Sequence, residues 1–205
     1  MRYRLSVPGD SQGLSDSLLR PEALWTRAEF FCRHSKVPKS SGVYAWYFRG
    51  LDNIVPCSPC VRHGEFSLLY VGISPSAPPK NGASSQSVRS RLRQHFRGNA
   101  EASTLRLTLG CLLADQLGLE LRRVGSGRGF TFSTGEQRLS QWLEENARVV
   151  WRCCDEPWIF EEELISVLDL PLNLDQNRRH AFHSELSRIR RDAKTRAREL
   201  PVLPR

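Results

Sequence analysis

Apolar side chains follow two different periods along this chain of 205 residues, and the period predicts the type of each element. Residues 41–48 (SGVYAWYF) and 67–74 (SLLYVGIS) are rich in aromatic and branched side chains, which favours two strands. Further along, Val88, Leu92 and Phe96 recur at every fourth position. That spacing predicts a helix with one apolar stripe.

The remaining expected elements are separated by turn residues. We expect helices at 21–32, 103–117, 135–146, 157–170 and 179–200, and strands at 119–124, 129–132 and 148–153. This mixed order predicts an α+β fold, in which helices cover a small, partly antiparallel sheet. We divide the chain into an N-terminal extension (1–39), a domain with insertions (40–175) and a basic C-terminal helix (176–205).

The composition is that of an ordinary soluble protein. Hydrophobic residues make up 40% of the chain and charged residues 25%, and the mean hydropathy is −0.43. No apolar stretch approaches the roughly 20 residues that a transmembrane helix needs. The first residues lack the apolar segment of a secretion signal. We therefore expect a cytoplasmic protein with no membrane partner.

Positive charge is unevenly distributed. The formal net charge is +8, and two arginine-rich clusters lie at 89–97 and 178–198. In the first cluster Arg89, Arg93 and Arg97 are spaced by four residues, so they would form a ridge on one helix face. Such a ridge is suited to a nucleic-acid backbone. The alternative is a solvated basic face without a specific partner.

The six cysteines raise the question of a metal site. Cys57, Cys60 and His63 have the spacing of zinc ligands, and Cys153 and Cys154 would have to complete the set. Adjacent cysteines make a poor second pair, so we favour ordinary thiols and keep zinc as the alternative. Without a secretion signal we do not expect disulfides.

Candidate site residues lie on the two expected strands and on the helix that follows. Because side chains alternate along a strand, antiparallel pairing would bring Tyr44 and Tyr70 to one pocket. Gly72 would let a backbone or substrate come close. Arg91 and His95 share one helix face, at the edge of the apolar stripe. Simple aromatic packing is the alternative for the tyrosines.

A third candidate lies in the segment IFEEELISVLDLPLN. Glu161 borders an apolar stripe that includes Leu164 and Ile165, whereas the two glutamates after it border a more polar face. A carboxylate held beside the core can bind Mg²⁺, which prefers oxygen ligands. Asn173, just after the helix-ending Pro171, would fix the backbone there by local hydrogen bonds.

Together these segments resemble a known family. The matching elements are Gly42-Val43-Tyr44, Tyr70-Val71-Gly72, Arg91, and Glu161 with Leu164, Ile165, Pro171 and Asn173 in order. In this order they resemble the GIY-YIG nuclease family over roughly residues 40–175. The runs LRLTLG (Leu105–Gly110) and PLNLDQN (Pro171–Asn177) are similar to a bacterial subgroup with insertions.

The resemblance implies an endonuclease that hydrolyses phosphodiester bonds in nucleic acid, with DNA favoured. Tyr44 would activate or position the attacking water, and Tyr70 would help to order it. Arg91 would brace the scissile phosphate, and His95 would assist with protons or bind phosphate. Glu161 would hold a single Mg²⁺ or Mn²⁺ ion against the leaving oxygen.

Two alternatives remain open from the sequence. The first alternative is a catalytically silent nucleic-acid-binding module of the same fold. The second is a repair or defence subunit that acts with a protein partner or as a homodimer. Retention of Tyr44, Tyr70, Arg91 and Glu161 together favours the enzyme, because binding alone does not require the glutamate.

Overall fold

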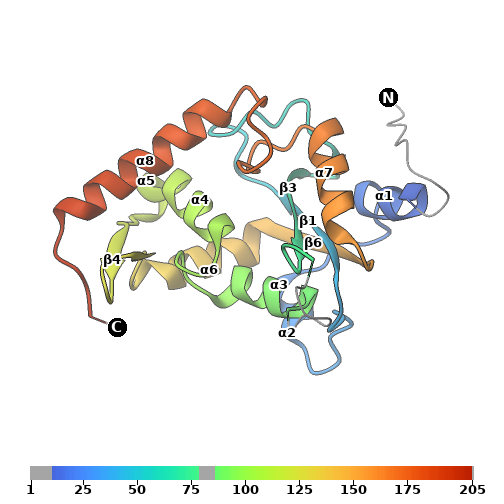
Figure 1. Ribbon diagram of the computed structural model, residues 1–205, viewed down its shortest axis with the longest axis horizontal. Coiled ribbons are helices and arrows are strands. Elements are labelled where there is room, and N and C mark those ends of the chain that lie inside the picture. The colour runs from blue at the N-terminus through green and yellow to red at the C-terminus, as the bar shows by residue number, and fades with distance from the viewer. Residues whose placement is uncertain (1–10, 79–85, 205) are drawn as a thin grey trace.

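The computed structural model describes residues 11–78 and 86–204 and centres on a four-stranded sheet (Figure 1). Its strands are β2 (Arg62–His63), β3 (Phe66–Ser74), β1 (Gly42–Phe48) and β6 (Ala147–Cys153), in that order. Each pairing within this sheet is antiparallel. A second, two-stranded ribbon consists of β4 (Arg122–Val124) and β5 (Gly129–Thr131). The α+β fold expected from the sequence is therefore confirmed.

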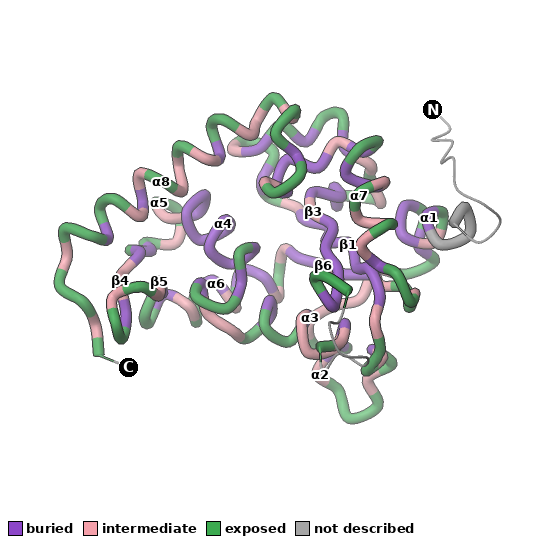
Figure 2. The backbone as a smooth tube through the Cα atoms, viewed as in Figure 1, coloured by how far each residue is buried: buried purple, intermediate pink, exposed green. Residues whose placement is uncertain are grey.

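Helices cover both faces of the sheet. They are α1 (Ser11–Leu19), α2 (Arg27–Phe31), α3 (Val88–Arg97), α4 (Thr104–Leu112), α5 (Ala114–Leu117), α6 (Gly135–Asn146), α7 (Pro157–Val167) and α8 (His183–Glu199). The central strand β1 is buried at every position (Figure 2). Tyr44, Trp46 and Phe48 join the core formed with α3, α4 and α6. The alternate residues, such as Val43 and Tyr47, join a second core with α1 and α7.

Helix α4 lies at the centre of the larger core. The LRLTLG run forms most of it, and each residue from Leu105 to Leu112 is buried. A side chain at Gly110 would collide with the ring of Phe132, because its Cβ would lie 2.1 Å from a ring carbon. Helix α8 packs along α4 and adds Leu186 and Ala193 to the same core (Figure 1). This packing fixes the basic C-terminal helix to the domain.

The outer edge of β3 is only partly covered by another strand. The short β2 pairs with Phe66 and Ser67 alone. Beyond them, the loop after α7 takes its place: Leu172 N–H donates to the carbonyl of Leu69 at 3.1 Å. The side chain of Asn173 accepts from Val71 N–H and donates to Val71 C=O, both at 2.9 Å. The local hydrogen bonds expected for Asn173 are thus replaced by a long-range bond to β3.

The main differences from the expected elements lie at the two ends of the chain. Instead of one helix at 21–32, only Arg27–Phe31 is helical, and α1 was not expected. The backbone of Trp25 pairs with Val149 at 3.0 Å in both directions, so tertiary pairing with β6 overrides helix propensity there. The last helix begins at His183 rather than at residue 179. Within the described ranges, no helix has the length and apolar character needed to cross a membrane.

Candidate functional site

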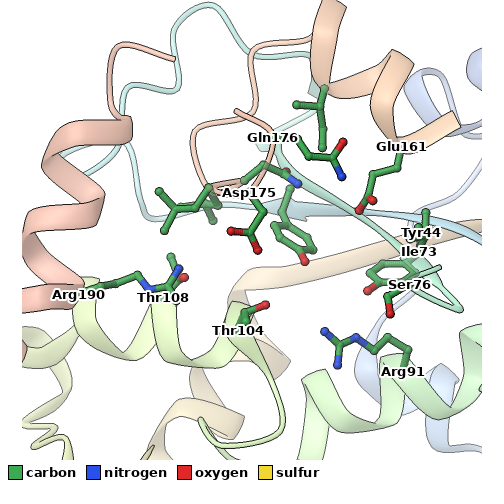
Figure 3. A pocket seen from close by; sticks show the side chains of 15 residues that line it. Tyr44, Ile73, Ser76, Arg91, Thr104, Thr108, Glu161, Asp175, Gln176 and Arg190 are labelled. Atoms are coloured by element: carbon green, nitrogen blue, oxygen red, sulfur yellow. The ribbon is translucent and has the colours of Figure 1, made fainter. Parts of the chain in front are cut away.

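A cavity of about 260 Å³ opens over the outer edge of β3 (Figure 3). Residues from two strands, from helices α3, α4, α7 and α8, and from the loop after α7 line it. Its polar lining residues are Tyr44, Tyr70, Ser76, Arg91, Thr104, Thr108, Glu161, Asn173, Asp175, Gln176 and Arg190. The structure therefore brings together four residues that the sequence singled out on separate elements: Tyr44, Tyr70, Arg91 and Glu161.

The two tyrosines reach the cavity from neighbouring strands. In the register of β1 and β3, Tyr44 pairs with Gly72 and Trp46 pairs with Tyr70, which puts both phenols on one face. A Cβ at Gly72 would lie 2.6 Å from the Tyr44 hydroxyl. Gly72 therefore makes room for the Tyr44 ring, and not for a backbone or substrate as the sequence suggested.

Gly42 meets a similar restriction at the other end of β1. A Cβ there would lie 2.1 Å from the carbonyl oxygen of Arg152 in β6. Only glycine allows the two strands to approach this closely. The first motif glycine thus has a packing role that keeps β1, and with it Tyr44, in place.

A buried hydrogen-bond chain extends from Tyr44 away from the cavity. The Tyr44 hydroxyl lies 2.9 Å from His95 Nε2, and His95 Nδ1 lies 2.7 Å from Ser103 Oγ. Ser103 Oγ also accepts from Arg106 N–H at 3.1 Å. His95 is 0% exposed and is not part of the cavity lining, so it lies behind Tyr44 and cannot contact a phosphate in the cavity directly.

Burial determines the proton occupancy of this chain. It raises the pKa of Tyr44 well above its ordinary value, with Tyr70 adding to the rise and Arg91 opposing it. Burial likewise raises the pKa of Tyr70 to about 12. Arg91 alone lowers the pKa of Tyr44, but burial raises it by more. Burial, Arg91 and Arg106 together lower the pKa of His95 well below 6.5, so its imidazole is neutral at neutral pH.

Glu161 reaches the cavity although its helix packs on the opposite face of the sheet. Leu164 and Ile165 of α7 join the smaller core. The loop after α7, however, covers the part of the β3 edge that β2 does not pair with, so α7 lies close enough for Glu161 to line the cavity. From there Glu161 points toward the side of the cavity where Tyr44 and Arg91 lie (Figure 3). The location of Glu161 on the same cavity as the tyrosines is what the catalytic interpretation requires.

A second carboxylate, which the sequence analysis missed, belongs to Asp175. Burial and the neighbouring charge of Asp175 raise the pKa of Glu161 to about 7, although Arg91 opposes the rise. Asp175 comes two residues after Asn173 in the PLNLD run. Because Asn173 is fixed to β3, the residue following it closely is also held at the cavity. That proximity to a motif residue was the one signal in the sequence.

Arginines enter the cavity from two opposite helices. Arg91 of α3 also donates to the side chain of Gln94 and to the carbonyl of Ala102, both at 3.1 Å. Arg190 of α8 lies beside Thr108 on the far side of the cavity (Figure 3). The sequence placed Arg190 in a basic cluster but gave no indication that it shares a site with Arg91.

A buried ion pair, also missed from the sequence, supports the helix that carries Arg91 and His95. Arg106 of α4 is 0% exposed, and its guanidinium lies 2.7 Å from the carboxylate of Glu136 in α6. The same guanidinium donates to the carbonyl oxygens of His95 and Phe96 at the end of α3, at 3.2 and 3.4 Å. Arg106 therefore joins α3, α4 and α6 immediately behind the cavity.

The ridge of Arg89, Arg93 and Arg97 faces the N-terminal segment. Arg89 donates to the carbonyl oxygens of Val37 and Ser35 at 2.6 and 3.0 Å. The guanidinium of Arg97 lies 3.6 Å from the ring centroid of Phe31, and that of Arg93 lies 5.7 Å from it. Arg89 thus has a structural role, while phosphate binding by this ridge stays a prediction.

The cysteines are all free thiols. Burial raises the pKa of Cys57 to about 11, and Cys60 lies 3.6 Å from a carboxylate oxygen of Asp169. His63 is turned away from them and bonds to the carbonyl of Pro21 at 3.1 Å. In the part of the chain that the structure describes, no three or more His, Cys, Asp and Glu side chains gather as metal ligands.

One cavity thus brings together two phenols, two arginines and two carboxylates, which are groups able to bind an anion, move a proton or hold a cation. Over residues 42–192 the chain matches the sequence profile of the GIY-YIG catalytic domain, which is well over half its length. The protein belongs to that family, whose domain is generally that of an endonuclease acting on nucleic acid. Comparisons with curated proteins and with solved structures gave no match.

Proposed function

We propose that this protein is a metal-dependent endonuclease that hydrolyses phosphodiester bonds, with DNA as the favoured substrate. The observation that carries the proposal is the convergence of Tyr44, Arg91 and Glu161, from three separate elements, on one cavity. A phosphodiester resists attack because its charge repels the nucleophile and the alkoxide leaves poorly. The cavity holds groups suited to each of these difficulties.

Tyr44 and His95 handle the proton of the attacking water. As water attacks phosphorus and the bond from phosphorus to the leaving oxygen breaks, the water proton passes to the Tyr44 oxygen while the Tyr44 proton moves to His95 Nε2, 2.9 Å away. The leaving alkoxide takes a proton from solvent. Nδ1 of His95 then donates to Ser103 Oγ. A substrate phosphate next to Arg91 offsets the guanidinium charge that opposes protonation of His95. Arg91 therefore orients the phosphate, and the bound phosphate assists the proton transfer to His95.

The acidic side of the cavity fits a divalent cation. Glu161 and Asp175 offer carboxylate oxygens, and Ser76 and Thr104 add hydroxyls to the same lining. Mg²⁺ and Mn²⁺ are bound by oxygen donors, and Mg²⁺ typically uses one or two carboxylates together with waters and substrate phosphates. Glu161 would be the principal ligand. When bound, the ion would supply positive charge for the developing charge on the leaving oxygen.

Glu161→Gln is the substitution that tests this proposal. It keeps the size of the side chain but removes the charge that holds the cation, so Mg²⁺-dependent cleavage should fall on the order of 10³-fold or more. Glu162→Gln is the matched control, because Glu162 is exposed on the same helix. Glu163 is a weaker control than the sequence suggested, since one of its carboxylate oxygens is buried.

The assay should offer the purified protein plasmid DNA, duplex and branched oligonucleotides, and RNA, each with Mg²⁺ or with chelator. Cleavage by the parent and by Glu162→Gln, together with its loss in Glu161→Gln, is the expected result. Binding without cleavage of any of these substrates would overturn the enzyme proposal and favour a silent binding module. Equal activity of the two variants would show that Glu161 is not the metal ligand.

A further inference from the structure

A second hollow, a groove of about 840 Å³, adjoins the cavity along helix α8. The groove and the cavity share Leu174, Asp175, Gln176 and Arg190 in their linings. Beyond Arg190 the groove is lined by basic and polar residues of α8 and the loop before it: Arg178, His183, Ser187, Arg191, Lys194 and Arg198. Asp175, at the cavity end, is the one carboxylate in the described lining.

The cations of this groove form a ridge along one side of α8. Arg190, Lys194 and Arg198 are spaced by four residues and so lie above one another on the helix. The adjacent face of α8 is held in the core by Leu186 and Ala193. Because α8 is packed against the core, the ridge that it carries has a fixed position and direction relative to the cavity.

Within the described ranges, no ion pair is found for the three cations of the ridge, although the charge of Asp175 acts on Arg190. Arg188, on another side of the same helix, is instead neutralised by Glu185 at 2.7 Å and Asp192 at 3.1 Å. The helix thus neutralises Arg188 outside the groove, and within the described groove lining only Arg191 is paired, with Asp192 at 3.7 Å.

The length of the ridge suits a run of phosphates. At 1.5 Å of rise per residue, Arg190 and Arg198 are about 12 Å apart along the helix axis. One strand of B-DNA rises about 3.4 Å per nucleotide along its axis, so the ridge spans roughly three to four phosphates. A single small anion would use only part of such a surface.

We propose that this groove binds the nucleic-acid strand on one side of the scissile phosphate, with Arg190 at the junction of cavity and groove. Lys194 and Arg198 contact backbone phosphates further along the same strand and take no part in bond cleavage. The inference rests on the proposed function and adds to it the direction in which the bound strand extends from the cavity. It also assigns strand binding to α8 rather than to the arginine ridge of α3.

A pair of double variants on α8 tests the groove. Lys194→Ala/Arg198→Ala removes two groove charges, whereas Arg188→Ala/Arg196→Ala removes two charges from the same helix outside the groove lining. Binding to a fluorescein-labelled duplex is measured in chelator, where no strand is cut, over a series of salt concentrations. Losing two phosphate contacts should weaken binding about tenfold or more at low salt and reduce the log–log salt slope by roughly 1.4–1.8.

The control variant should keep the parent's salt slope. Lys194→Gln/Arg198→Gln, which retains most of the side-chain length, should reproduce the groove effect, and thermal unfolding checks that each variant is folded. Equal losses in the groove and control variants, or no loss in either, would overturn the groove assignment.

A cleavage assay then separates this result from the proposed function. With Mg²⁺ the groove variant should show a raised KM, while its single-turnover rate at saturating DNA stays within a few-fold of the parent. If Glu161→Gln abolishes cleavage but the groove variant binds like the control, the groove proposal fails and the nuclease proposal stands. If the parent cuts nothing, the nuclease proposal fails, and the binding series still decides whether α8 holds the strand.

Discussion

Two helices on opposite sides of the cavity carry basic residues at four-residue spacing, and the fold uses them differently. On α3, Arg89 is bound to the carbonyl oxygens of Val37 and Ser35, and Arg97 lies on the ring of Phe31. On α8, Arg190 and Lys194 line an open groove next to the cavity. The difference teaches that a basic ridge stays available for an anion where the protein supplies few acceptors of its own, which is why we propose α8 as the binding surface.

The largest stability effect is expected for the arginine most fully committed to the protein. Arg106→Ala should lower the free energy of unfolding by about 3–5 kcal/mol, because it leaves the carboxylate of Glu136 without its partner in a part-buried network. Urea unfolding measures this. Arg138→Ala is the control, since Arg138 makes an exposed bond to the carbonyl of Gly118. A loss below about 1 kcal/mol for Arg106→Ala would contradict the supporting role.

The next effect concerns how the stability of the protein depends on the titration of Glu161, which lines the cavity between α3 and α8. The pKa of Glu161 in the folded protein is about 7, against an ordinary value of 4.5. The folded state therefore holds this proton more tightly than the unfolded state. The resulting contribution to stability is fully present below pH 4.5 and is lost as the pH rises through 7. At 1.36 kcal/mol per pH unit, the loss amounts to about 3 kcal/mol.

Glu161→Gln removes this titration, so in chelator at about pH 8 the variant should be more stable than the parent by up to about 3 kcal/mol, and nearly equal to it near pH 4.5. Urea unfolding at the two pH values provides the measurement. Glu162→Gln should follow the parent. Adding Mg²⁺ at the higher pH should stabilise the parent but not Glu161→Gln. A parent stability that does not fall over this range would contradict the account of the cavity.

A smaller effect separates the two ridges directly. Arg89→Ala should cost about 1.5–3 kcal/mol of stability, the usual contribution of hydrogen bonds from a charged donor, and leave the salt slope of DNA binding unchanged. Lys194→Ala should do the reverse, with little change in stability and a slope reduced by roughly 0.7–0.9. A reduced salt slope for Arg89→Ala would return phosphate binding to α3.

The sequence predicted the elements with the strongest periodicity. The two tyrosine strands follow from their aromatic and branched side chains, and α3 follows from a four-residue apolar repeat. Both signals are largely independent of the rest of the fold. Glu161 could be singled out because it borders an apolar stripe on its own helix. These signals come from residues close together in the sequence, and the structure contains the strands and the helix that they predicted.

What the sequence could not predict depends on distant partners. Arg89 and Arg190 occupy similar basic patterns, and only the loop that contains Ser35 and Val37 distinguishes them. Arg106 looked like one charge in an apolar run, because its partner Glu136 lies 30 residues further along the chain. Asp175 joins the site because Asn173 binds β3 across 102 residues of sequence.

We propose that one face of β1 takes part in phosphodiester cleavage and that the other face serves packing alone. The two tyrosines of that strand test this contrast most directly. Tyr44 bonds to His95 at the cavity, whereas the hydroxyl of Tyr47 donates to the carbonyl of Leu18 at 2.7 Å on the opposite face. Tyr44→Phe and Tyr47→Phe each remove one buried hydroxyl from the same strand. They differ in the side of the sheet that they change.

The measurement is the single-turnover rate of Mg²⁺-dependent DNA cleavage at saturating enzyme. Tyr44→Phe should lower it about 10²–10⁴-fold, the usual contribution of a positioned proton-transfer group, with DNA affinity within a few-fold of the parent. Tyr47→Phe should cleave at close to the parent rate, although it loses about 1 kcal/mol of stability. If both variants cleave at the same rate, the cavity beside Tyr44 is not where the phosphodiester is cut.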